Sequence, residues 1–77
     1  MISYLEGKIL EKEEKFFTIN VNSVGYKIFS HTGVLEKIPE AGRDAKVWTH
    51  LYVREDALDL YGFLDRDELE FFEVLIS

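Results

Sequence analysis

The chain has 77 residues, no cysteine and a formal net charge of −6, with 47% hydrophobic and 14% aromatic residues. This length suits one small domain, the apolar content argues against disorder, and the lack of cysteine excludes disulfides and thiolate metal sites. The acidic balance alone disfavours a nucleic-acid-binding protein, because phosphate neutralisation requires a surplus of Lys and Arg.

The first part of the chain predicts three strands, over residues 2–10, 16–21 and 24–29. Its start has no basic region and no long apolar run, so we expect no signal peptide, no membrane span and a cytoplasmic location. Gly7 inside the first strand predicts a bulge or a tight bend. The charged run 11–15 and the pair Asn22-Ser23 are typical of turns, and Gly25 is expected to relieve strain beside the second turn.

The middle of the chain predicts a short helix and then a strand hairpin. Residues 32–38 are typical of one or two helical turns, with Thr32 as the N-cap. Residues 46–53 form the clearest predicted strand, because both of its faces are largely apolar or aromatic. Residues 58–64 predict a fifth strand, and Arg54–Ala57 between the two predicts a tight hairpin tip.

The last segment changes to a helical period. Asp65 followed by Glu68 is typical of a capping box at the start of a helix. Apolar residues then recur on two adjacent helical stripes, the first with Leu69, Phe72 and Ile76 and the second with Phe71 and Leu75. We expect this helix either to pack on the strands or to begin a further domain.

The order of these elements predicts the fold class. Five strands with a short helix between the third and the fourth are the order of an all-β OB-fold barrel. We therefore predict a five-stranded OB-fold barrel for residues 1–64 and a C-terminal helix after it. A closed barrel also hides strand edges, which suits so small a chain.

The most unusual candidate site is the predicted hairpin tip, Arg54-Glu55-Asp56. Two adjacent carboxylates stand there, although the flanking strands carry aromatic side chains. Asp is common in turns and exposed charges are usually only solvated, so composition alone favours an inert tip. Neighbouring carboxylates on a turn also do not face each other across a cleft, as a glycosidase pair must.

Other residues with chemical potential have simpler structural explanations. His31 and His50 lack the spacing of metal ligands or of a general base. Four aromatic residues are candidates for nucleobase stacking, beside the basic Lys27 and Lys46, although core packing is the favoured interpretation: Phe16, Phe29, Trp48 and Tyr52. No glycine-rich phosphate loop and no paired nucleophile is visible, so we expect no enzyme activity, no cofactor and no metal.

Several segments together indicate a family. The chain opens with Met1-Ile2-x-Tyr4-Leu5-x-Gly7 and later contains Val24-Gly25-Tyr26 and Leu35 through Pro39-Glu40-Ala41-Gly42. The most specific run is Thr49-His50-Leu51-Tyr52-Val53-Arg54-Glu55-Asp56-Ala57, continued by Leu60-Tyr61-Gly62-Phe63. Through these segments essentially the whole chain resembles the N-terminal domain of the RuvA family, bacterial proteins that bind Holliday junctions.

The resemblance implies a non-catalytic, cytoplasmic domain that acts in recombination, DNA repair and the SOS response. Proteins of this family form homotetramers that hold four-way junction DNA open and flat. Their expected partners in branch migration are a RuvB-type ATPase and, through the full-length protein, a RuvC-type resolvase. The family places an acidic pin at the crossover, and the matching residues here are Glu55 and Asp56, with Arg54 beside them. Residues 65–77 would begin a truncated second domain, whose helix-hairpin-helix motifs supply the DNA grip that this acidic domain lacks.

Two alternative functions remain open. One is a general single-stranded nucleic-acid-binding OB-fold, which requires exposed stacking rings. The other is a module that only oligomerises. The role of Arg54 is also open, because it either orients the tip or touches a phosphate.

Overall fold

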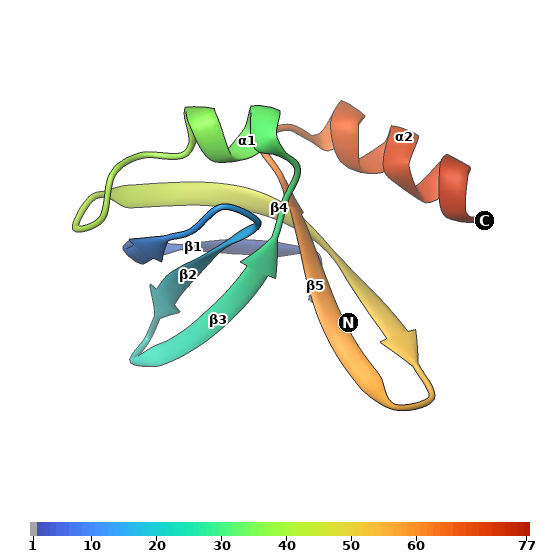
Figure 1. The fold of residues 1–77 in the computed structure, drawn as a ribbon, viewed down its shortest axis with the longest axis horizontal. Helices are drawn as coiled ribbons and strands as arrows, with labels where there is room; N and C mark the ends of the chain where they lie inside the picture. The colour runs from blue at the N-terminus through green and yellow to red at the C-terminus, as the bar shows by residue number, and fades with distance from the viewer. Residues whose placement is uncertain (1) are drawn as a thin grey trace.

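The computed structural model describes residues 2–77, so Met1 of the opening motif lies outside the described residues. The elements follow one another as β1 (Tyr4–Lys12), β2 (Phe16–Val21), β3 (Val24–Phe29), α1 (Thr32–Lys37), β4 (Asp44–Arg54), β5 (Ala57–Phe63) and α2 (Arg66–Ile76). Figure 1 shows the strands curving around one another, with α1 at one end and the β4–β5 hairpin projecting away from it.

The strands close into a barrel in the order β1-β2-β3-β5-β4. Neighbours pair antiparallel except β3 and β5, which run parallel and pair through only Ile28 with Leu60 and Phe29 with Tyr61. With α1 between the third and fourth strands and α2 at the end, this order confirms the predicted five-stranded OB-fold barrel.

Because successive strand side chains point to opposite faces, each strand turns one apolar face into the barrel. The most completely buried strand side chains are Ile9, Phe17, Ile19, Ile28 and Val47. Buried residues of α1, among them Val34, join the same core cluster. Thr49 is a polar residue inside the barrel, and its hydroxyl donates to the carbonyl of Ile2 at 2.9 Å. That bond satisfies a polar group that would otherwise be costly to bury.

β1 differs from the sequence prediction in where it ends and in where its bulge lies. β1 continues through Lys12, so the charged turn is shorter than residues 11–15. The bulge lies between Ile9 and Glu11, where the register with β2 shifts, and not at Gly7. A Cβ at Gly7 would lie 2.1 Å from the backbone oxygen of Asn20, so this glycine permits close approach of β2.

The predicted role of Gly25 and the predicted N-cap of α1 were wrong. Asn22 and Ser23 form the predicted turn, and they carry positive φ angles of 51° and 70° themselves, so Gly25 is not needed to relieve strain. The N-cap of α1 is His31 and not Thr32, because the His31 side chain accepts a hydrogen bond from the backbone N–H two residues later. A histidine nitrogen thus replaces the usual hydroxyl oxygen at this cap.

The start of α2 confirms the predicted capping residue. Asp65 is the N-cap, and its carboxylate accepts a hydrogen bond of 2.8 Å from the backbone N–H of Glu68. Acidic residues in the first turn also suit the positive end of the helix dipole. Across residues 2–77, no helix has the length and apolar character needed to cross a membrane.

α2 packs against the outer face of the β4–β5 hairpin. Leu69 is buried, and the ring of Phe72 lies 5.5 Å from that of Tyr61 and 5.0 Å from that of Phe63. The first of the two expected outcomes, packing on the strands, is therefore met by Leu69 and Phe72, whereas Ile76 of the same predicted stripe is 44% exposed. A second stripe stays exposed on the same helix: Phe71, Val74 and Leu75.

Replacing Phe72 by Ala is expected to lower the unfolding free energy by about 1–3 kcal/mol, because several aromatic contacts and part of the buried ring area are lost. Replacing Phe71, which is 66% exposed, by Ala is the matched control and should change it by less than ~0.5 kcal/mol. Urea denaturation measures both. Equal losses in the two variants would show that Phe72 does not dock α2.

Candidate functional site at the tip of the β4–β5 hairpin

The β4–β5 hairpin is the element that extends furthest from the barrel end carrying α1 (Figure 1). Its pairing is continuous from Trp48 opposite Phe63 to Arg54 opposite Ala57. Glu55 and Asp56 form the two-residue turn that follows. A regular ladder up to the turn holds the tip in a defined position, as a functional projection requires.

The two tip carboxylates are exposed. Within residues 2–77, neither Glu55 nor Asp56 takes part in an ion pair or a side-chain hydrogen bond. Their negative charges therefore remain uncompensated at the end of the hairpin. The structure thus places two of the three predicted site residues side by side and free to face a ligand.

Arg54, the third predicted residue, turns away from them. Its guanidinium forms an ion pair with the carboxylate of Asp59 on β5. The same group lies over the ring of Tyr52, 5.7 Å from the ring centre. Tyr52 and Asp59 are direct cross-strand partners, so all three side chains share one face of the hairpin.

The opposite face of the hairpin is apolar. Val53 and Leu58 are cross-strand partners there, with exposed fractions of 63% and 70%. They continue the inward-facing alternation beyond the point where the barrel encloses it. The hairpin therefore combines an apolar face, an Arg–Asp–Tyr face and an acidic tip.

Sequence reasoning missed Asp59. It is a carboxylate between Leu58 and Leu60 in a strand that is otherwise apolar or aromatic. The signal was available, because a two-residue turn after Arg54 sets an antiparallel register in which residues 54 and 59 are diagonal neighbours.

The two histidines serve α1 and α2. Besides capping α1, His31 lies with its Nε2 3.8 Å from a carboxylate oxygen of Glu68. His50 Nδ1 lies 3.0 Å from a carboxylate oxygen of Glu73, which ties β4 to α2. Among the described residues, no group of three or more His, Asp or Glu side chains is placed to hold a metal ion.

The aromatic candidates for stacking are largely engaged with one another. Trp48 packs against Tyr4 with ring centres 4.9 Å apart. Phe16 and Phe29 lie 6.1 Å apart, and the ammonium of Lys27 lies 4.3 Å from the Phe16 ring centre. These three rings pack against neighbouring side chains, whereas Tyr52, the fourth candidate, is 40% exposed.

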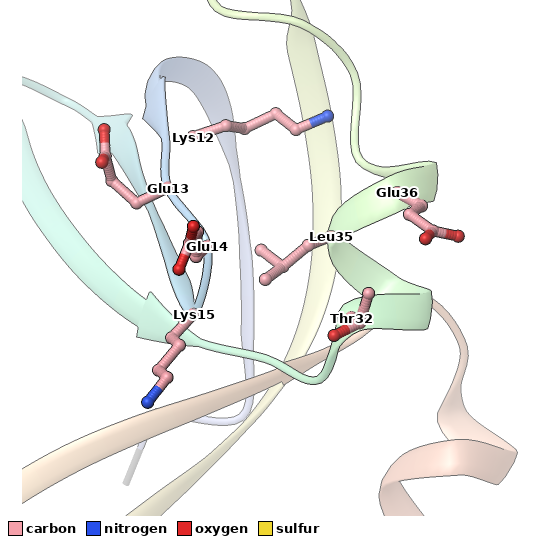
Figure 2. A pocket seen from close by; sticks show the side chains of 7 residues that line it. All are labelled: Lys12, Glu13, Glu14, Lys15, Thr32, Leu35 and Glu36. Atoms are coloured by element: carbon pink, nitrogen blue, oxygen red, sulfur yellow. The ribbon is translucent and has the colours of Figure 1, made fainter.

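A hollow of about 740 Å³ lies elsewhere, between the β1–β2 turn and α1. Figure 2 shows its charged side chains spread around the rim, and the lining residues are Lys12, Glu13, Glu14, Lys15, Thr32, Leu35 and Glu36. The ammonium of Lys12 donates to the carbonyl of Ile38 at 2.9 Å, so one of its two cations is used in packing. This hollow brings together none of the predicted site residues.

Fold and site together define an OB-fold domain that presents an acidic hairpin tip. Residues 1–62 match the family model described as the RuvA N terminal domain. The chain therefore belongs to the RuvA N-terminal domain family, which confirms the resemblance that the hairpin residues indicated.

Several curated relatives are similar along the whole chain. Proteins named "Holliday junction branch migration complex subunit RuvA" match with 46% identity in Acetivibrio thermocellus, 44% in Chloroherpeton thalassium and 35% in Clostridium botulinum strain Loch Maree, each over 77 residues. All of this chain is covered, but only 38%, 38% and 39% of those proteins. The chain thus spans about two fifths of the length of these relatives.

Proposed function

We propose that this domain is the N-terminal part of a Holliday junction-binding protein and that Glu55 and Asp56 form an acidic pin at the strand crossover. The observation that carries the proposal is the pair of unpartnered carboxylates at the end of a projecting hairpin, in a member of the RuvA family. Arg54, which pairs with Asp59, does not neutralise them.

The pin acts by repulsion. Two unit charges ~6 Å apart repel by roughly 0.7 kcal/mol in bulk water and by about 3 kcal/mol at an effective dielectric of ~20. Phosphates at the crossover would meet Glu55 and Asp56 at such distances, and the strands would be guided outward instead of collapsing together. Repulsion biases the paths of the strands but does not hold DNA.

Affinity must then come from other parts of the protein. In the proposed arrangement, residues 65–77 begin a second domain with helix-hairpin-helix motifs, which hold the DNA backbone. The exposed stripe of α2, with Phe71, Val74 and Leu75, supports this, since it is free to pack against such a domain. Four copies of the protein would surround one junction.

The domain itself would be non-catalytic. A RuvB-type ATPase would drive branch migration, and a RuvC-type resolvase would act on the same junction during recombination and repair in the bacterial cytoplasm. The relatives support a role in branch migration, because their name describes a subunit of a branch migration complex.

A pure oligomerisation module is the second candidate. The exposed pair Val53 and Leu58 favours it, because apolar side chains at such a projection are typical of surfaces that contact another chain. General single-strand binding has less support, since Trp48 and Phe16 pack against other rings and the exposed ring of Tyr52 lies under the Arg54 guanidinium.

Sedimentation velocity separates these functions. The full-length protein is expected to form tetramers that co-sediment with a synthetic four-way junction and only weakly with duplex DNA or oligothymidine of matched length. Tetramers that ignore the junction would leave only the oligomerisation module. Preference for oligothymidine, with quenching of Trp48 fluorescence, would contradict the junction proposal in favour of single-strand binding.

A further inference from the structure

Asp59 is a carboxylate in an unusual place. It lies on β5, opposite Tyr52, and only 19% of its side chain is exposed. Its chain neighbours Leu58 and Leu60 point to the opposite face of the hairpin, so Asp59 shares its face with Tyr52 and Arg54. Its side-chain partner is the guanidinium of Arg54, which is 48% exposed.

The geometry holds Arg54 from two sides. Asp59 accepts from its Nη2, and the ring of Tyr52 lies beneath the guanidinium, 5.7 Å away. Tyr52 in turn packs edge-to-face against Tyr61, with ring centres 6.3 Å apart. Tyr61 contacts Phe72 of α2, so the support of Arg54 continues into the packed part of the domain.

The restraint on Arg54 affects the net charge of the hairpin tip. The residue adjoins Glu55, and a long flexible guanidinium at a hairpin tip is well suited to bidentate contact with a phosphate. An unrestrained Arg54 would either neutralise part of the Glu55–Asp56 charge or attract DNA at the point where these carboxylates repel it. Arg54 is 48% exposed, so solvent screens its pair with Asp59 and the pair contributes only modestly to folding stability.

We propose that Asp59 is a positioning residue that keeps Arg54 off the DNA and so preserves the repulsive character of the tip. This inference rests on the proposed pin function of Glu55 and Asp56. It makes Asp59 a determinant of junction selectivity, although its own carboxylate touches no DNA.

The test is the salt dependence of junction binding by the full-length protein with Asp59→Asn. Freed Arg54 should gain a phosphate contact, so affinity at low salt should rise severalfold and selectivity for junction over duplex DNA should fall. The slope of log affinity against log salt should steepen by up to ~0.9 for each new phosphate contact. Asp59→Glu, which keeps the charge, should restore the parent values.

Arg54→Gln provides the matched control. In the parent it should leave the salt slope unchanged, because Arg54 is engaged with Asp59. Combined with Asp59→Asn it should abolish the gain in slope and affinity. Thermal unfolding of every variant measures the stability of the fold independently of DNA binding. If Asp59 had a purely structural role, Asp59→Asn would lower the melting temperature without steepening the salt slope.

Three outcomes would overturn the proposal: an unchanged slope in Asp59→Asn, a gain that persists in the double variant, or a loss of slope in Arg54→Gln alone. Failure of the pin function is a distinct result. It would appear as unchanged affinity and selectivity when Glu55 and Asp56 are neutralised, whatever the variants at residues 54 and 59 do.

Discussion

Full-length protein that carries both Glu55→Gln and Asp56→Asn is expected to bind four-way junction DNA more tightly and to discriminate less between junction and duplex DNA. Both substitutions keep side-chain size and remove one negative charge each. Because neither carboxylate has a protein partner in residues 2–77, their removal breaks no ion pair and should leave the fold intact. The altered binding would therefore report repulsion alone.

The expected gain at low salt is about tenfold, which corresponds to ~1.4 kcal/mol. It should shrink as salt is added, because the Debye length falls from about 10 Å at 0.1 M to about 3 Å at 1 M. Electrophoretic mobility shift or fluorescence anisotropy titrations at several salt concentrations measure it. We also expect altered branch migration when a motor ATPase is supplied.

The chain offers a matched control for the charge change. Glu13 and Glu14 are adjacent, exposed carboxylates at the β1–β2 turn, so Glu13→Gln with Glu14→Gln removes the same charge from another turn. Only the tip variant should alter junction selectivity. An equal effect from both double variants would mean that net charge, and not a pin, governs DNA binding.

Replacing Gly7 by Ala is expected to destabilise the barrel strongly. A Cβ there would lie 2.1 Å from the backbone oxygen of Asn20 and 3.1 Å from a methyl carbon of Val21. Backbone cannot withdraw as a flexible side chain can, so β1 and β2 would have to separate where Lys8 pairs with Asn20. We expect a loss of more than ~3 kcal/mol in unfolding free energy.

That loss is large beside the total stability. A domain of this size is stabilised by roughly 4–12 kcal/mol, so Gly7→Ala should remove at least about a quarter of that stability. Gly25→Ala is the control, since its Cβ would meet only side-chain carbons at 3.5 and 3.9 Å, which is ordinary contact. Urea denaturation followed by circular dichroism measures both. Similar midpoints for the two variants would show that β1 and β2 can separate at little cost.

The sequence by itself determined the class of this fold. Strict alternation in segments such as 17–21 marks strands, because successive side chains point to opposite faces. Asp65 with Glu68 marks the start of α2, because a cap depends only on residues within one helical turn. The run from Thr49 to Ala57 indicated the family and brought attention to Glu55 and Asp56. These signals are local, so they can be seen without the rest of the structure.

Tertiary structure decided which side chains meet. Local pattern left Arg54 with two possible roles, and only the β4–β5 register placed it against Asp59. The choice of the Phe72 stripe over the Phe71 stripe depended on the rings that β5 presents to α2. Likewise, only the approach of β2 shows why Gly7 has no side chain. Contacts between elements depend on register and packing of distant segments, which periodicity within one segment does not encode.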